Sequence, residues 1–422
     1  MMPPVGFRPV AIIVQKYGGT SVAGPEEIKR VAARIVKTAE AGNSVCAVVS
    51  AMGHTTDELI GLAAQVSSDP HPREMDMLLT SGERISMALV SMAINDLGHE
   101  AASFTGSQAG IVTDTTHGRA RIIEMRRGRV HEALDEGKIA IVAGFQGVST
   151  TKDVTTLGRG GSDTTAVALA AALGAEVCEI YTDVDGVYSA DPRIVPNARK
   201  RKQVSFEEML DLAASGARVL ALRSVEYARN HGVRIHVRSS FNESEGTWIL
   251  KEEDMEQAII SGVAHDTSEA KVTIRRVPDR PGVAGRTFRP LAEAGINIGE
   301  IVQNTSIDGL ADISFTLPEN ELERAEPILE QLSREIEAEG FTSERDIAKV
   351  SVIGAGMKSN PGVAAAIFEA LADAGINIEI ISTSSIRVSC VVPAADCERA
   401  VNVIHERLKL ADNVDYKDGT GE

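Results

Sequence analysis

Cysteine is scarce in this 422-residue chain, and its four cysteines form no recognisable metal or redox motif. There is no C-x-x-C pair, and no two histidines have the spacing of zinc ligands. Cys46 and Cys178 lie inside apolar segments typical of strands, where a thiol is usually a small core residue. A zinc site and a disulfide framework are therefore not expected, and we expect a cytoplasmic protein.

Long apolar runs and positive charge are also lacking. No apolar run approaches the roughly 20 residues of a membrane span, and the N-terminus lacks the pattern of a secretion signal. The formal net charge of -17 argues against nucleic acid or an anionic membrane as a partner. With 43% hydrophobic and 24% charged residues, the composition is that of a soluble globular protein. The length predicts roughly two or three domains.

The common phosphate-binding motifs are absent, yet one segment has the pattern of a phosphate loop. GxxxxGK[ST] does not occur, and no GxGxxG opens the first predicted helix. Instead, an apolar strand runs into Lys16, Gly18 and Gly19, and a helix with apolar residues at helical spacing follows. This arrangement lets backbone N–H groups approach a phosphate, while the lysine adds a positive charge. A tight turn beside a surface lysine is the alternative at this point.

Apolar strands alternate with helices over residues 10–250, which predicts a three-layer α/β sandwich around a parallel sheet. Ligands gather at the carboxyl ends of strands in such sheets, so the loops KYGGTS, SAMGHTTDE, GFQG and YTDVDG mark a candidate site. We predict strands at 10–16, 45–50, 140–145, 177–182 and 233–237. We predict helices at 26–41, 75–97, 162–173 and 219–230. The polar, acidic segment 242–256 is interpreted as a linker.

An internal repeat follows this region. PGVAGRTFRPLAEAGINI, starting at Pro281, closely matches PGVAAAIFEALADAGINI, starting at Pro361, which indicates a duplication. Each copy is predicted to form strand, helix, strand, strand and helix, and a closing strand would give the ferredoxin-like βαββαβ pattern. A strand predicted at 258–264 is left over, which suggests that one copy borrows a strand across the other. The predicted domains are 1–250, 257–345 and 346–422.

Together these motifs resemble those of the aspartokinases, within the amino-acid kinase superfamily. The resemblance spans nearly the whole chain and rests on KYGGTS, SAMGHTTDEL, LLTSGERIS, FTGSQAG, TTLGRGGSDTTA, YTDVDGVYSADPR and the two repeats, which are similar to ACT regulatory domains. It implies a three-layer αβα amino-acid-kinase domain followed by two ferredoxin-like ACT domains. It also implies transfer of the ATP γ-phosphoryl group to the β-carboxylate of L-aspartate, giving 4-phospho-L-aspartate, the first step of lysine, threonine and methionine biosynthesis.

The resemblance implies that Lys16 and Asp163 are catalytic, with Lys16 at the transferring phosphate and Asp163 holding it. Arg218 stands where the family more often has a lysine, and its guanidinium can still neutralise charge. Mg²⁺ would be held mainly by ATP oxygens and water. The implied nucleotide-binding residues are Lys16, Tyr17, Gly18, Gly19, Ser50, Thr182, Asp183, Tyr188, Ser189, Ala190, Asp191, Pro192, Arg193 and Arg218.

For aspartate, the guanidinium fork of Arg159 suits the α-carboxylate, and Glu83 suits the ammonium group. The implied substrate-binding residues are Thr56, Glu83, Arg159, Gly160, Gly161 and Ser162. Purely structural roles remain open for two residues in this region. Ser162 could cap the helix that follows, and Asp163 could stabilise its dipole. His54 and His117 lie in loops near these motifs, and we assign neither a direct role.

The two ACT-like repeats imply regulation by an amino acid. Asp279 could hold a ligand ammonium group in the first copy, and the second copy lacks it, so we expect one composite site; a structural turn is the alternative. The implied effector-binding residues are Asp279, Pro281, Gly282, Val283, Ala284, Asn297, Ile298, Gln303, Val363, Ala364, Asn377, Ile378, Ser384 and Ser385. The family leads us to expect inhibition by lysine and threonine together.

Two assemblies and three activities are open. The resemblance implies either a homo-oligomer formed through the ACT domains or an α2β2 assembly with a shorter chain started near Met255. Aspartate kinase is the favoured activity. The alternatives are another carboxylate kinase, acting on glutamate or N-acetylglutamate, and a catalytically inactive amino-acid sensor. The intact Lys16, Glu83, Arg159 and Asp163 argue against the sensor.

Overall fold

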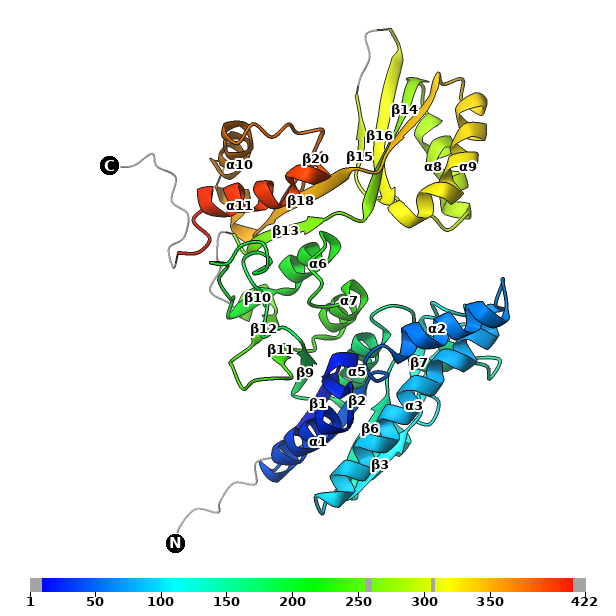
Figure 1. The fold of residues 1–422 in the computed structure, drawn as a ribbon, viewed down its shortest axis with the longest axis vertical. Coiled ribbons are helices and arrows are strands. Elements are labelled where there is room, and N and C mark those ends of the chain that lie inside the picture. The colour runs from blue at the N-terminus through cyan, green and yellow to red at the C-terminus, as the bar shows by residue number, and fades with distance from the viewer. Residues whose placement is uncertain (1–9, 255–259, 305–307, 361, 413–422) are drawn as a thin grey trace. The chain divides into compact units, whose positions relative to one another are not determined.

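The computed structural model describes residues 10–254, 260–304, 308–360 and 362–412 (Figure 1). The chain forms two compact units, which we describe separately. The first is Met1–Val187, Lys200–Ala213 and Arg218–Glu256, and the second is Tyr188–Arg199, Ala214–Ala217 and Gln257–Glu422. Met255, the residue proposed as a second start, lies outside the described part of the chain.

An eight-stranded sheet forms the centre of the first unit, in the order β10-β12-β11-β9-β1-β2-β6-β3. Its strands are β1 (Ile12–Tyr17), β2 (Ser44–Val49), β3 (Ala101–Phe104), β6 (Ile139–Ala143), β9 (Val177–Thr182), β10 (Gln203–Ser205), β11 (Ile235–Ser239) and β12 (Thr247–Leu250). The five strands predicted from sequence pair in parallel, and β1 lies between β2 and β9. These central strands are buried on both faces, as their near-continuous apolar sequences predict.

Helices cover both faces of this sheet, which confirms the predicted three-layer sandwich. They are α1 (Pro25–Glu40), α2 (Thr55–Val66), α3 (Pro72–Asp96), α4 (Gly128–Asp135), α5 (Gly161–Leu173), α6 (Phe206–Ala214) and α7 (Leu222–His231). Tyr17 lies in one apolar core with residues of α1 and α3. Because side chains alternate along a strand, Lys16 points to the opposite face, where α5 packs against β1.

Helix α3 is long and apolar enough to cross a membrane by length and composition alone. However, it carries Asp76 and Glu83 as buried side chains and packs against α1 and α2 in the first unit. A core helix of a folded domain meets the same length criterion, and buried carboxyl groups at these positions indicate a packed interior face.

A second, four-stranded sheet in the first unit has the order β5-β4-β7-β8. Its strands are β4 (Ile111–Thr113), β5 (Ile122–Met125), β7 (Gln146–Ser149) and β8 (Val154–Thr156). Since β8 ends directly before the loop that leads into α5, this small sheet positions the start of that helix.

One prediction for the first unit is wrong. The segment 242–256, interpreted as a linker, contains β12, which pairs with β10 and β11. Thr247 and Ile249 are buried, and Trp248 stacks on His236 with ring centroids 4.0 Å apart. The segment TWIL alternates between buried and half-buried positions over only four residues. Because acidic residues flank it on both sides, the segment was interpreted as polar and this short strand was missed.

The second unit contains two four-stranded antiparallel sheets, one for each repeat, which confirms the ferredoxin-like prediction. The first repeat contributes β14 (Glu269–Pro278), α8 (Val283–Glu293), β15 (Ile301–Gln303), β16 (Leu310–Pro318), α9 (Leu322–Glu335) and β17 (Gly340–Glu344). The second contributes β18 (Ile347–Ile353), α10 (Gly362–Asp373), β19 (Ile380–Thr383), β20 (Arg387–Pro393) and α11 (Cys397–Arg407).

A strand from before the first repeat completes the sheet of the second. The sheet orders are β15-β16-β14-β17 and β13-β18-β20-β19, where β13 is Gly262–Asp266. β13 borders β18 just as β17 borders β14. The region predicted as the first ACT domain, 257–345, therefore includes one strand that belongs to the sheet of the second repeat.

The segment 188–199, which lies within the domain predicted at 1–250, packs with the second unit. Ala190 and Val195 belong to the apolar core of the second repeat. Ser189 is fully buried, and its Oγ lies 2.9 Å from Nε2 of His405 on α11. The backbone N–H of Val263 in β13 donates to the carbonyl oxygen of Ser189 at 2.8 Å.

Candidate active site

A pocket of about 290 Å³ opens in the first unit, where loops follow the carboxyl ends of β1 and β2. Its lining residues come from five separate segments of the sequence. They are Lys16, Gly18, Gly19, Ser50, Ala51, Gly53, Thr56, Glu83, Phe145, Gly158, Arg159, Gly160, Gly161, Ser162 and Asp163. The structure thus gathers the glycine loop, all the residues assigned to aspartate and the GRGGSD segment in one place.

An ion pair joins the two residues predicted to be catalytic. Nζ of Lys16, near the end of β1, lies 2.7 Å from Oδ1 of Asp163, in the first turn of α5. Each side chain is only 12% exposed, so the pair faces the pocket with little water around it. The carboxylate therefore holds the ammonium group at the sheet edge.

Glycines bring the backbone close to the pocket. A Cβ at Gly19 would lie 2.9 Å from the carbonyl oxygen of Ala51, and one at Gly160 would lie 2.2 Å from Cβ of Ala221. Gly160 also has a φ of 73°, and it directly precedes α5. Because no helical acceptor is available to the first N–H groups of α5, they form a ready site for an anion.

Glu83 is the second buried carboxyl group of the pocket. It lies on α3, is 3% exposed, and its Oε1 accepts a hydrogen bond from the backbone N–H of Ala51 at 3.2 Å. Its Oε2 is buried and has no hydrogen-bond partner among the described residues. Burial raises the pKa of Glu83 to about 7, so a ligand cation would restore the ionised form.

Sequence reasoning missed four of the lining residues, Ala51, Gly53, Phe145 and Gly158. All four lie in or next to segments singled out as strand-end loops or motifs. Phe145 is unusual, because it has a φ of 66° without being glycine. Its backbone N–H donates to Oγ1 of Thr165, a residue of α5, at 3.2 Å. Residues other than glycine store backbone strain in this conformation, and such residues cluster at ligand-binding sites.

Other residues assigned to the nucleotide do not line this pocket. The side chain of Tyr17 is buried and stacks on Tyr181 with centroids 4.8 Å apart, so only its backbone is available to a ligand. Thr182 is the last residue of β9, the neighbour of β1, and its hydroxyl group donates to Oδ1 of Asp183, the next residue, at 3.0 Å. Arg218 is exposed.

Six further nucleotide candidates lie in the second unit. They are Tyr188, Ser189, Ala190, Asp191, Pro192 and Arg193. Ser189 and Ala190 are buried in its core, which leaves their side chains no access to a ligand. Asp191 and Arg193 form an ion pair at 2.6 Å at the surface, so the DPR sequence makes a self-paired turn here.

The residues predicted to bind an effector all lie in the second unit. Most are exposed: Asp279, Pro281, Gly282, Ala284, Asn297, Gln303, Asn377, Ser384 and Ser385. Val283, Ile298, Ala364 and Ile378 are half-buried against the two apolar cores. Val363 is 1% exposed, so its side chain packs in the core and only its backbone is available to a ligand.

The sequence was compared with known families, curated proteins and solved structures. It matches the Amino acid kinase family over residues 11–239, and ACT domains over 272–337 and 350–408. Aspartokinase from Mycolicibacterium smegmatis is 59% identical over 407 residues, which cover 95% of this chain and 97% of that protein. The predicted fold class and enzyme class are thereby confirmed.

Two solved structures share the fold over nearly the whole chain. One is E. coli aspartokinase III in complex with aspartate and ADP in its R-state, with a TM-score of 0.81, 25% identity, and coverage of 94% of this chain and 100% of that one. The other is the same enzyme with lysine and aspartate in its T-state, with a TM-score of 0.72, 25% identity, and coverage of 94% and 99%. The kinase domain, the two ACT domains and the identity to curated enzymes show that this chain belongs to the aspartokinases of the amino acid kinase family.

Proposed function

We propose that the pocket binds L-aspartate beside ATP and that the chain transfers the γ-phosphoryl group to the β-carboxylate, giving 4-phospho-L-aspartate. The observation that carries the proposal is one pocket that holds both the Lys16–Asp163 ion pair and the buried carboxyl group of Glu83. The first suits a phosphate and the second an ammonium group. E. coli aspartokinase III was solved with aspartate and ADP, which supports this pair of ligands.

Phosphoryl transfer requires mainly positioning and charge neutralisation from a protein. Lys16 donates from its ammonium group to the transferring phosphate, and Asp163 keeps that group oriented. The amide of Gly19 and those at the start of α5 bind phosphate oxygens, and the amide of Gly18 can join them only by leaving the carbonyl oxygen of Tyr181, to which it donates at 3.4 Å. When bound, Mg²⁺ would neutralise charge on the nucleotide, and nucleotide oxygens and water would supply most of its ligands.

Aspartate is held through its α-ammonium and α-carboxylate groups, which leaves its side-chain carboxylate free to react. Glu83 accepts hydrogen bonds from the ammonium group, and Arg159 binds the α-carboxylate with its guanidinium fork. Thr56 donates its hydroxyl group, and the Gly160–Ser162 backbone borders the bound substrate. Within the first unit, Thr182 and Asp183 are further candidates for nucleotide contacts, since they lie at the carboxyl end of β9, the strand next to β1.

Regulation by lysine together with threonine is the second part of the proposal. It is supported by the two ACT domains of this chain and by the T-state structure of E. coli aspartokinase III, which contains lysine. The exposed loops at Asp279 and at Asn377 and Ser384 are the candidate effector contacts. Association through the ACT domains is supported by exposed apolar residues, Ile301 and Ile381, on the edge strands β15 and β19.

ADP release measured with L-aspartate and with L-glutamate tests the activity, and hydroxylamine traps the acyl phosphate that is formed. Aspartate-dependent release with a trapped hydroxamate is expected, together with inhibition when lysine and threonine are both present. Equal turnover of glutamate would contradict the choice of substrate. Full activity in the presence of both amino acids would contradict the regulatory part alone.

A further inference from the structure

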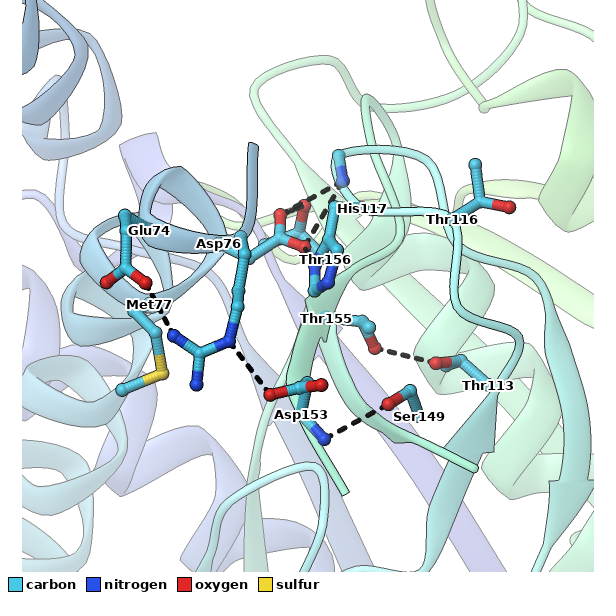
Figure 2. A network of polar contacts seen from close by, with 12 residues as sticks. Glu74, Asp76, Met77, Thr113, Thr116, His117, Ser149, Asp153, Thr155 and Thr156 are labelled. Atoms are coloured by element: carbon cyan, nitrogen blue, oxygen red, sulfur yellow. Dashed lines mark hydrogen bonds and ion pairs between the residues drawn. The ribbon is translucent and has the colours of Figure 1, made fainter. Parts of the chain in front are cut away.

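We propose that Asp76 is a positioning residue that holds the loop carrying Arg159 and thereby sets the affinity for the amino-acid substrate. Asp76 lies on α3, two turns before Glu83, and its side chain is only 1% exposed. Figure 2 shows it between His117 and Thr156. The assignment rests on the proposed function, because it concerns how the aspartate site is shaped.

The carboxylate of Asp76 joins three segments of the first unit. Its Oδ1 accepts from Oγ1 of Thr156 at 2.6 Å, and its Oδ2 lies 2.6 Å from Nδ1 of His117. The backbone N–H of Gly118 donates to both oxygens, at 3.1 and 3.2 Å. A buried carboxylate is tolerated when its oxygens are satisfied in this way, so helix α3, the loop at 117–118 and strand β8 are held together through one group.

From this group, direct contacts lead to the active-site loop. The backbone N–H of Ala120 donates to the carbonyl oxygen of Thr156 at 2.9 Å. The guanidinium group of Arg223 donates to the carbonyl oxygens of Leu157 and Ala120, at 3.0 and 2.8 Å. The segment 117–120 therefore supports the backbone at 156–157 from one side.

The next residues of the loop depend on the same support. Gly158 has a φ of 77°, and a Cβ there would lie 3.1 Å from the carbonyl oxygen of Gly118. Arg159 follows directly and lines the pocket with Gly158, Gly160 and Gly161. A loop with three glycines has little stiffness of its own. Its position is set by the segment that Asp76 anchors.

Helix α3 also carries the other substrate-binding group. Asp76, Thr80 and Glu83 are buried at helical spacing on one face, and Nε2 of Gln146 donates to the carbonyl oxygen of Thr80 at 3.1 Å. One rigid helix thus holds Glu83 and anchors the loop of Arg159. The ammonium and α-carboxylate groups of an amino acid are a fixed distance apart. A shift of Arg159 relative to Glu83 therefore weakens the contacts that these two residues make with the substrate.

A second carboxylate nearby supplies a matched control. Asp153 accepts from Nε of Arg73 at 2.9 Å at the edge of the same network in Figure 2. These side chains are 32% and 45% exposed. Asp153 lies close enough to His117 for their charges to interact, but among the described residues neither side chain is hydrogen-bonded to the segment 117–120 or to Thr156. Asp153→Asn therefore changes charge in the same region and leaves the hydrogen bonds of the loop in place.

Steady-state kinetics of four variants of the full chain test the proposal. Thr156→Val removes the hydroxyl donor at nearly constant volume, Thr156→Ser keeps it, and Asp76→Asn weakens the acceptor. We expect the KM for aspartate to rise about tenfold or more in Thr156→Val and Asp76→Asn, with the KM for ATP changed less than about twofold. Thr156→Ser and Asp153→Asn should stay near the wild type. Parallel changes in both KM values, or an unchanged KM for aspartate in Thr156→Val, would overturn the proposal; Thr156→Val decides if Asp76→Asn does not fold.

Amide hydrogen exchange separates this proposal from the function on which it rests. In Thr156→Val, exchange should quicken about tenfold in peptides covering 117–120 and 157–163, while Thr156→Ser matches the wild type. The wild type could show no aspartate-dependent ADP release while Thr156→Val shows this faster exchange. That outcome would contradict the proposed substrate and leave the positioning role in place. Exchange that is unchanged in these peptides, or raised uniformly along the chain, would refute the positioning role itself.

Discussion

Lowering the pH from 8 to 6 should weaken aspartate binding about tenfold through Glu83 alone. Its carboxyl group is 3% exposed, and burial raises its pKa to about 7. Only the ionised form accepts the substrate's ammonium group as an ion pair. The KM for aspartate should therefore scale as 1 + 10^(7 − pH), which is about 1.1 at pH 8 and about 11 at pH 6. The side-chain carboxylate of the substrate titrates near 4, below this range.

Initial rates at saturating MgATP, with coupled detection of ADP, give the KM for aspartate at each pH between 6 and 8.5. Glu83→Gln is the matched variant, because the amide keeps the shape of the side chain and cannot ionise. Losing a hydrogen bond to a charged group costs about 1.5–3 kcal/mol, so its KM should be raised about 10- to 150-fold at pH 8. That raised KM should not change with pH.

Two results would refute this reasoning. The first is a wild-type KM for aspartate that stays constant from pH 8 to pH 6. The second is a Glu83→Gln variant that keeps the tenfold pH dependence, since some other group would then be responsible. The KM for ATP, measured on the same samples, should be unchanged by Glu83 and controls for general loss of structure.

Three further predictions concern single residues of the first unit. Lys16→Ala should lower kcat by about three orders of magnitude or more with an unchanged circular dichroism spectrum, and retained activity would show that the ion pair with Asp163 is not catalytic. Between pH 4.5 and 7 the folded state keeps the proton of Glu83 while the unfolded state loses it. The free energy of unfolding should therefore fall by about 3 kcal/mol as the pH rises through this window. Urea unfolding at pH 8 should accordingly find Glu83→Gln more stable than the wild type. Gly160→Ala should lower activity, because its Cβ would lie 2.2 Å from that of Ala221 and because the backbone φ at this position is 73°. Adding Ala221→Gly should recover part of the lost activity. No recovery would contradict the clash.

The place of the pocket could be predicted from sequence because loops at strand ends contribute most of its lining. Lys16, near the end of β1, and Asp163, in the first turn of α5, lie far apart in the chain, and a parallel sheet brings such segments to one edge. Glu83 lies within α3, so its place at the pocket was implied only by the resemblance to the aspartokinases. Apolar runs identified the central strands for the same reason, since both faces of these strands are buried. The short strands β4, β5, β7 and β8 were missed, because three or four residues carry too little periodicity.

Long-range pairing was beyond what local patterns contain. Ala190 and Val195 lie within the predicted kinase domain, 1–250, yet they pack in the core of the second repeat. The leftover strand before the first repeat could be recognised, but its partner, β18, could not be inferred from its own residues. Likewise, the sequence places Tyr17 beside Lys16, while the alternation of side chains along β1 sends them to opposite faces of the sheet.

Two buried carboxyl groups on one helix show why a functional residue cannot be identified by burial alone. Asp76 and Glu83 lie on the same face of α3, and both are nearly inaccessible to water. Both oxygens of Asp76 accept hydrogen bonds from the protein, so this group can bind nothing further and holds structure. Glu83 has a buried Oε2 without a partner among the described residues, and it lines a pocket. The cost of leaving that oxygen unpaired is recovered only when a donor enters, and for this reason we propose Glu83 as a ligand-binding group and Asp76 as its support.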